Sequence, residues 1–370
     1  MRIALLATGN ELVNGDITNT NSAKIAHLLI EHDYVINTHL VVNDDDHAIL
    51  NSLHYLSQAH QVIIITGGLG PTTDDRTRFA VADFVSQPLI FDDSSWAHIT
   101  QRFTHFNLPL TENNRQQALF PEKAQIFPNI NGTANGCRVN TKNMFIYLLP
   151  GPPMECLPMM LTHILPDIQA HFQPTPLFKK KWRLFGVSES EIATRLEAVL
   201  KEEPVTTGYR IDYPYLEFKI TAQSEALNTP WLAALESEIH PYLLAAPHQS
   251  ASELLKEALS GLPSPLLMID EATGGELYQR LSDRKNYTQL VYTQKKGMPE
   301  SGYFAVINIE GLAEYWAELD SVTETTLMLT FTQGEETMQK VLTIPYRPFR
   351  VLKYAAEIIA NQLLIWLFKK

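Results

Sequence analysis

The chain has 370 residues, 45% hydrophobic and 19% charged, a composition typical of a globular protein with two or three domains. It carries 41 Asp and Glu against 29 Lys and Arg, so its formal net charge is −12 and it repels a phosphate backbone. The main basic cluster, KKKWR at 179–183, is predicted to be a solvated strand start. These features argue against a nucleic-acid partner.

Cysteine usage and hydropathy indicate the compartment. Cys137 and Cys156 lack zinc-type spacing, which predicts reduced thiols in a cytoplasmic protein. The apolar N-terminal run is too short for a signal peptide, and no segment reaches the roughly twenty apolar residues of a membrane helix. The tail AAEIIANQLLIWLFKK is interrupted by Glu357, Asn361 and Gln362, so we expect a core helix and no membrane partner.

In the first part of the chain, strands alternate with helices. Apolar runs predict strands at 3–7, 34–42, 62–66 and 144–149, and helical periodicity appears at 21–31, 47–59 and 154–171. This alternation favours an α/β fold: a three-layer, doubly wound, mostly parallel sheet in a domain spanning 1–174.

After the linker QPTP (173–176) the pattern changes. Strands are predicted at KKKWRLFG, 205–211 and 216–221, with helices opened by an S-x-x-E capping box at Ser188 and spanning 231–244. This predicts a small α+β domain at 175–247. Helices at 251–259, from 274 to 281 and at the C-terminus, with strands at 265–269, 304–309, 325–332 and 341–344, predict a short third α/β domain at 248–370.

Glycines and carboxylates follow the strands of the first domain. In an open parallel sheet the functional crevice lies beyond the carboxyl ends of the strands. Glycine turns there allow backbone amides to approach phosphate, and carboxylates beside phosphate require a bridging divalent metal. The residues expected at this edge are Gly9, Asn10, Glu11, Asp44, Gly67, Gly68, Gly70, Asp74, Asp75, Gly151 and Glu155.

A plainer interpretation of the stretch GGLGPTTDD stands beside this one. Glycines after a strand often only turn the chain, and Asp74 or Asp75 would then cap a helix beginning near Thr77. Other active-site patterns, such as GxSxG, HExxH or a P-loop, do not occur.

The first 175 or so residues resemble the molybdopterin-binding-like (MoaB/MogA-like) domain of the CinA family. The resemblance rests on ordered motifs over the whole domain: TGNEL, G-x-I-x-x-T-N, VVNDD, GGLGPTTDDRT, NRQQA, N-x-x-G-T-A and LPGPPME. CinA-type chains continue with a KH-like domain and a nicotinamide mononucleotide deamidase domain, in line with the three parts above. The family also implies a homodimer.

For the first domain the resemblance implies metal-dependent hydrolysis of ADP-ribose to AMP and ribose 5-phosphate. Asp75 and Asp44 would be catalytic and, with Glu11, Asp74 and Glu155, would hold Mg²⁺, Mn²⁺ or Co²⁺. Its motifs add Thr72, Asn114, Gln116, Gly132 and Thr133 to the glycines and Asn10 as substrate or phosphate contacts.

Two positions depart from the family pattern. The usual Lys-Gln-Ala is Gln116-Gln117-Ala118 here, which removes a cation, and the usual proline of G-T-A-P-G is Asn135. The alternative is therefore a protein that binds a nucleotide or pterin-like ligand without turnover.

The third domain departs further from the family. Where the deamidase has A-E-S-C-T-G-G, this chain has IDEATGG at 269–275, with Glu271 at the serine position, and the Tyr/Lys and A-G-P motifs have no counterpart. We expect an inactive deamidase-like domain; residual deamidase activity with Glu271 as nucleophile is a third hypothesis. The middle domain lacks the G-x-x-G loop of nucleic-acid-binding KH modules and has the acidic LKEEPV instead.

Overall fold

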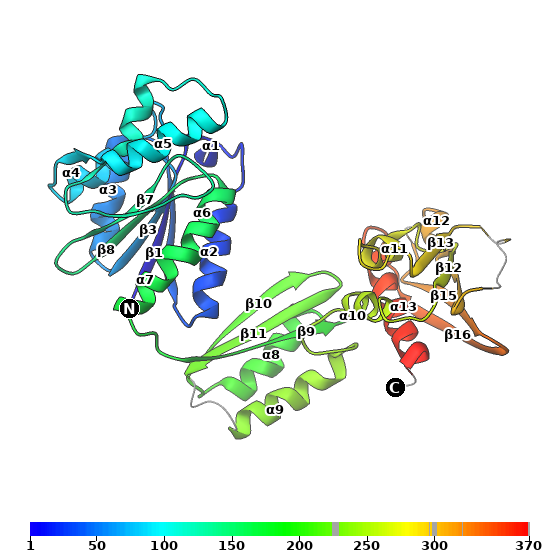
Figure 1. Cartoon of the computed structure of the whole chain (residues 1–370). Coiled ribbons are helices and arrows are strands. Elements are labelled where there is room, and N and C mark those ends of the chain that lie inside the picture. The colour runs from blue at the N-terminus through cyan, green and yellow to red at the C-terminus, as the bar shows by residue number, and fades with distance from the viewer. Residues whose placement is uncertain (224–228, 296, 298–301, 320, 369–370) are drawn as a thin grey trace. The chain divides into compact units, whose positions relative to one another are not determined.

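The structure is a computed structural model that describes residues 1–223, 229–295, 297, 302–319 and 321–368. The chain forms two compact units, Met1–Pro176 and Leu177–Lys370 (Figure 1). The first unit therefore ends two residues after the predicted boundary at 174. The predicted boundary between 247 and 248 lies inside the second unit and stays a prediction.

The first unit contains a six-stranded sheet in the order β2-β1-β3-β8-β7-β6. The first four strands are parallel, and β7 and β6 are antiparallel to their neighbours. The strands are β1 (Ile3–Thr8), β2 (Ile36–Val42), β3 (Val62–Thr66), β6 (Gln125–Phe127), β7 (Gly136–Asn140) and β8 (Phe145–Leu149).

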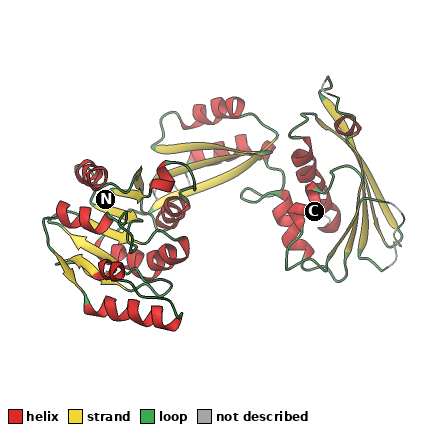
Figure 2. Cartoon of the chain, turned by 90° about the horizontal axis from the view of Figure 1, so that it is seen from above, coloured by secondary structure: helices red, strands yellow, loops and turns green. Residues whose placement is uncertain are grey.

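Helices cover both faces of this sheet (Figures 1 and 2). On β1, Ala4 and Leu6 pack toward α3 and α4, whereas Ile3 and Leu5 pack toward α2, α6 and α7. Both sides of the strand are buried, which explains its continuous apolar sequence. The predicted three-layer, mostly parallel architecture is confirmed. The helices are α2 (Thr20–Glu31), α3 (Asp46–Ser57), α4 (Thr77–Phe84), α6 (Pro153–Met159) and α7 (Leu165–His171).

The structure contains elements of this unit that the sequence does not predict. The predicted helix at 154–171 contains a π-helical turn, Met160–Ile164, between α6 and α7. No element is predicted between α4 and β8, although this segment contains the 13-residue helix α5 besides its short strands. It and the loop after β1 hold α1 (Asn10–Val13), β4 (Leu89–Phe91), α5 (Asp93–His105), a 3-10 turn (Glu112–Ala118) and β5 (Leu119–Pro121).

The second unit begins with an antiparallel sheet in the order β10-β11-β9, whose strands are β9 (Leu177–Phe185), β10 (Val205–Asp212) and β11 (Tyr215–Gln223). Trp182 packs against α8 (Glu189–Leu200) and α9 (Pro230–Ile239) in one cluster. The predicted helix at 231–244 ends early, at Ile239, and a 3-10 turn that contains Pro241 follows it. Proline has no amide hydrogen to continue the helix.

The basic cluster of β9 is paired with acidic side chains. Lys180 contacts Glu236, Lys181 lies 3.3 Å from Glu217, and Arg183 lies 2.8 Å from both Asp212 and Glu253. Three cations of the cluster therefore have an acidic partner within the second unit.

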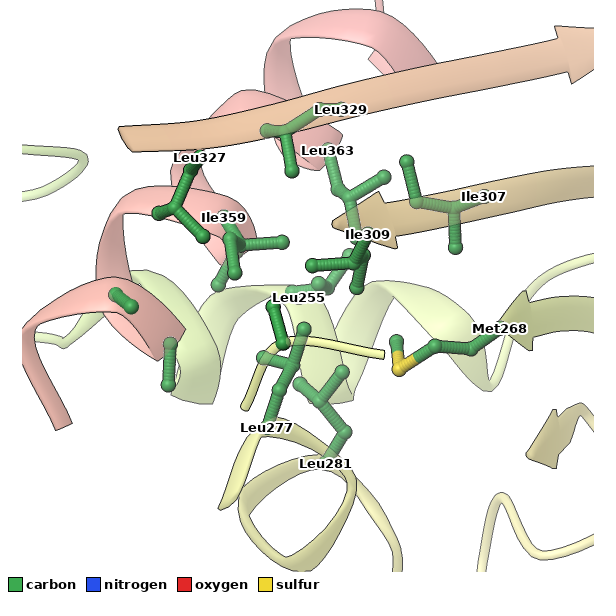
Figure 3. Packing of buried hydrophobic residues seen from close by; sticks show 14 of the residues in the cluster. Leu255, Met268, Leu277, Leu281, Ile307, Ile309, Leu327, Leu329, Ile359 and Leu363 are labelled. Atoms are coloured by element: carbon green, nitrogen blue, oxygen red, sulfur yellow. The ribbon is translucent and has the colours of Figure 1, made fainter. Parts of the chain in front are cut away.

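The second unit also holds a mixed sheet in the order β13-β12-β14-β15-β16, with helices on one face (Figure 2). Leu255, Leu277, Ile359 and Leu363 point from the helices toward Ile309 and the other strand residues labelled in Figure 3. β16 is longer than the predicted 341–344. The elements are α10 (Ala251–Leu259), β12 (Leu266–Asp270), α11 (Glu276–Leu281), β13 (Leu290–Thr293), β14 (Ala305–Gly311), α12 (Ala313–Trp316), β15 (Glu324–Gln333), β16 (Glu336–Pro345) and α13 (Val351–Phe368).

Among the described residues, α13 is the one helix whose length and hydropathy would allow it to cross a membrane. Val351, Ala355, Ile359 and Leu363 of this helix are fully buried in the core of the mixed sheet. α13 therefore packs as the core helix that the sequence predicts.

Candidate functional site at the strand ends of the first unit

A cavity of about 550 Å³ opens at the carboxyl ends of the parallel strands. Thr8 at the end of β1, Thr66 at the end of β3 and Gly151 after β8 line it, together with Asp44 after β2. The predicted residues that line it are Gly9, Glu11, Asp44, Gly67, Gly68, Gly70, Asp74, Asp75, Thr133, Gly151 and Glu155.

The glycine turn after β3 is shaped by close packing. Gly67 and Gly68 have φ angles of 104° and 63°, in the left-handed region. A Cβ on Gly67 would lie 2.3 Å from the Thr8 carbonyl oxygen, and one on Gly68 would lie 2.2 Å from Thr77 Oγ1. Both turn glycines are therefore required for the loop to fit between β1 and α4.

Asp75 organises the loop that follows. Its carboxylate accepts hydrogen bonds from the Gly70 amide at 2.7 Å, the Thr72 amide at 2.9 Å and the Thr72 hydroxyl. The alternative that Asp74 or Asp75 caps α4 is wrong: the residue before α4 is Arg76, and the helix has no side-chain cap. A carboxylate offers about four acceptor sites, so one remains on Asp75.

The cavity wall is acidic. Five carboxylates line it, and no Lys, Arg or His among the described residues does; the five are Glu11, Asp44, Asp74, Asp75 and Glu155. The pKa of Asp44 is raised by burial and by the charges of Glu11, Asp74 and Asp75, despite the hydrogen bond donated by the Asn10 amide at 2.9 Å. Within the part of the chain that the structure describes, no basic side chain faces these carboxylates from the wall, although the buried Arg78 behind it interacts with the charge of Asp75.

These donors fit a metal that is shared with phosphate. Among the described residues, no group of three or more His, Cys, Asp or Glu is close enough to hold a metal ion alone. Mg²⁺ commonly takes one or two carboxylates and completes its shell with water and phosphate oxygens. The carboxylates around Asp44 suit that arrangement, not an all-protein cage.

Several predicted phosphate contacts are already engaged within the protein. The amides of Gly9, Gly67, Gly70 and Gly132 donate to Val42, Leu149, Asp75 and Asn129, respectively. Within the part of the chain that the structure describes, the Gly68 and Gly151 amides have no acceptor. These two amides are the glycine donors that remain for an anion.

Gln117, not the predicted Gln116, faces the cavity. Gln116 does not line the cavity, and its amide donates to the carbonyls of Gly70 at 3.0 Å and Thr72 at 2.7 Å. Gln117 lines the cavity and donates to Thr133 Oγ1 at 3.1 Å. The lost cation at 116 therefore affects the support of the Asp75 loop rather than a group facing the cavity.

The remaining predicted contacts lie outside the cavity lining. Neither Asn10, Thr72, Asn114 nor Gly132 lines the cavity. Asn114 instead belongs to the capping box of the 3-10 turn. A Cβ on Gly132 would lie 2.0 Å from Glu155 Oε2, so this glycine makes room for Glu155.

Three polar features of the site were missed. Asn21 lines the cavity beside Thr20; both stand in the G-x-I-x-x-T-N motif, which was the available signal. Asn129 donates to Glu155 Oε2 at 2.7 Å and orients it. Arg78 of α4 is 1% exposed, and burial lowers its pKa to about 10; no sequence pattern marks a helical arginine as buried.

The loop that corresponds to the deamidase motif is closed by aromatic side chains. Asp270 accepts from the Thr273 amide and hydroxyl, and Trp316 Nε1 donates to the Ala272 carbonyl at 2.8 Å. A Cβ on Gly274 would lie 3.0 Å from the Trp316 ring. Tyr292 of β13 also stands beside this loop, since a Cβ on Gly275 would lie 3.3 Å from its hydroxyl. That the Tyr/Lys and A-G-P motifs have no counterpart here stays a prediction. Lys296, nearby in sequence, lies outside the described residues.

Comparison with known proteins places the chain in a family. Residues 4–170 match the family described as a probable molybdopterin binding domain. A competence-damage inducible protein of Alkaliphilus metalliredigens is 31% identical over 291 residues, covering 76% of this chain and 70% of that protein. A CinA-like protein of Syntrophotalea carbinolica is 30% identical over 287 residues, with the same coverage.

One solved structure, the protein CinA from Thermoplasma acidophilum, is 28% identical and covers 45% of this chain and 97% of that one, with a TM-score of 0.42. The sequence matches and the three-layer first unit agree, and the chain belongs to the CinA-like, competence-damage-inducible family, with a molybdopterin-binding-type domain at its N-terminus.

Proposed function

We propose that the first unit hydrolyses the diphosphate of ADP-ribose, or of a related nucleoside diphosphate derivative, to AMP and ribose 5-phosphate in a reaction that requires a divalent metal. The observation that supports this most is the cavity wall of five carboxylates without a basic residue. Such a wall repels a diphosphate unless a cation lies between them.

Asp44 is the first residue that would hold the metal, with Glu11 or the remaining acceptor site of Asp75 beside it. A bound divalent metal would neutralise the diphosphate and lower the pKa of an attacking water. Mg²⁺, Mn²⁺ and Co²⁺ all accept such oxygen donors.

The chain itself supplies positioning. The Asn10 amide holds Asp44, and Asp75 holds the Gly70–Thr72 loop in place. The Gly68 and Gly151 amides are available to phosphate oxygens. Glu155, oriented by Asn129, is placed to accept a proton from a water or a hydroxyl in the cavity.

The test is incubation of the purified protein with ADP-ribose and each metal in turn, with AMP resolved by chromatography. Asp44→Asn should abolish AMP formation, whereas Asp93→Asn, the same change on the exposed start of α5, should not. AMP formation without added metal in the presence of chelator, or undiminished in Asp44→Asn, would contradict the proposal.

A protein that binds nucleotide or a pterin-like ligand without turnover is the alternative outcome. It is favoured by the neutral Gln116, which supports the Asp75 loop without a charge. Binding of ADP-ribose without AMP release would establish it. We further propose that the deamidase-like part is inactive, because Trp316 packs on the loop that contains Gly274. We also propose that the protein is a cytoplasmic homodimer without a nucleic-acid partner.

A further inference from the structure

Helix α2 begins at the cavity. Thr18, Asn19, Thr20 and Asn21 all line it. Asn19 caps the helix by accepting a hydrogen bond from the Ser22 amide at 3.1 Å. The first turn of α2 is therefore a fixed part of the cavity wall. Through Asn21 it contacts Gly151 after β8, whereas Asp44 follows β2, three strands away in the sheet.

The side-chain amide of Asn21 has a hydrogen-bond partner at its nitrogen but none at its oxygen among the described residues. Its Nδ2 donates to the Gly151 carbonyl at 2.6 Å, which fixes the orientation of the amide because the reverse would set two oxygens together. Its Oδ1 is buried and has no hydrogen-bond donor among the described residues, and the whole residue is 8% exposed. A buried acceptor without a donor destabilises the folded protein, so a partner from outside the chain is expected.

The chemistry of that partner follows from the wall. An amide oxygen repels phosphate oxygens and accepts from hydroxyl groups, and acceptor side chains are what bind a ribose diol in nucleotide sites. Because neighbouring strands lie about 4.8 Å apart, β2 and β8, three positions apart in the sheet, are separated by roughly 14 Å. A ligand reaching from Asp44 to Gly151 is therefore extended, with its phosphates and its sugar at different places.

We infer that Asn21 Oδ1 accepts a hydrogen bond from a ribose hydroxyl of a nucleotide bound in this cavity, and so selects ribonucleotides over deoxyribonucleotides and inorganic pyrophosphate. The inference rests on the proposed function for the nucleotide nature of the ligand. It does not require that the ligand is hydrolysed.

The experiment is a calorimetric titration of the full chain in the presence of Mg²⁺. The titrated ligands are AMP, 2′-deoxy-AMP, 3′-deoxy-AMP and pyrophosphate. In the wild type, removal of the ribose hydroxyl that donates to Asn21 should weaken nucleotide binding about three- to tenfold. In Asn21→Ala the same removal should change binding less than twofold, and pyrophosphate should bind both proteins equally. Asn51→Ala, at an exposed position of α3, is the matched control.

Three outcomes overturn the inference: neither deoxynucleotide binds the wild type more weakly than AMP, Asn21→Ala weakens pyrophosphate as much as AMP, or the wild type binds none of the three nucleotides. The proposed function falls separately, when ADP-ribose and metal give no AMP. The comparison in the wild type stands even where Asn21→Ala does not fold. Hydroxyl-dependent AMP binding without ADP-ribose hydrolysis would remove the hydrolase and leave the inference intact.

Discussion

At the scale of single residues, Asp44 shows how the cavity balances charge. Burial and three neighbouring carboxylates raise its pKa, so ionising it costs stability in the folded protein. The stability that Asp44 contributes is present when the carboxyl is protonated and is lost as the pH rises through its raised pKa.

Asp44→Asn should therefore raise the melting temperature of the ligand-free protein by about 1–3 °C at pH 7.5. The difference should shrink as the pH falls through the raised pKa of Asp44, because the wild-type carboxyl then takes up its proton. Differential scanning fluorimetry across pH measures it, with Asp93→Asn as control. A lower melting temperature for Asp44→Asn at pH 7.5 would show that its carboxylate is compensated by a group other than those described.

Gly68 carries a second prediction at this scale. Gly68→Ala should destabilise the protein by at least about 2 kcal/mol, because the left-handed conformation and the overlap with Thr77 Oγ1 add. Gly15→Ala is a matched control, since Gly15 has a φ of 79° and no atom within 4 Å of the added Cβ. It should cost only about 1 kcal/mol. Urea denaturation compares the two, and equal losses would mean that the loop moves away from Thr77 at little cost.

The sequence predicts which residues face the cavity where their place after a strand determines it. Asp44 and Gly68 follow strands whose carboxyl ends meet at one edge, so their convergence was predictable. Gln116 and Gln117 show the limit: neighbours in a 3-10 turn point in different directions, and only the fold decides which faces the cavity. The engagement of the Gly70 amide by Asp75 was equally hidden, because it depends on loop conformation.

At the scale of elements, the two capped helices of the second unit differ in how completely their caps are formed. Ser250 and Glu253 form a reciprocal capping box at α10. At α8, where the sequence predicts the same box, Ser188 accepts from the Glu191 amide at 3.4 Å but the return contact is missing. The S-x-x-E spacing thus predicts the start of α8 correctly, but only one of the two hydrogen bonds of the capping box forms.

Ser250→Ala should accordingly cost about 1–2 kcal/mol, and Ser188→Ala about 0.5–1 kcal/mol. The larger value also reflects the 3.2 Å contact between the hydroxyls of Ser250 and Ser252. Chemical denaturation of each variant, followed by circular dichroism, provides the comparison. The interpretation fails if Ser188→Ala is the more costly change.

At the scale of the whole molecule, a buried carboxylate links the two sheets of the second unit. Glu357 of α13 is 0% exposed. Its Oε1 accepts from Ser252 Oγ at 2.5 Å and from Arg280 at 3.2 Å, and its Oε2 accepts from the Tyr215 hydroxyl at 2.8 Å and the Ser252 amide at 3.1 Å. Tyr215 belongs to the antiparallel sheet, and the other partners belong to the helices of the mixed sheet, so one side chain joins both.

All four partners of Glu357 are donors, and a glutamine has only one oxygen to offer them. Glu357→Gln would set an NH₂ group against two donors, and we expect a loss of about 3 kcal/mol or more. Since Tyr215 would lose its acceptor, the antiparallel sheet and the mixed sheet should then unfold in separate transitions. Calorimetry of the full chain, with exposed Glu335→Gln as control, would show one broad or two resolved transitions for the variant. A second-unit transition that stays single and shifts no further than in the control would mean that the apolar contacts alone join the two sheets.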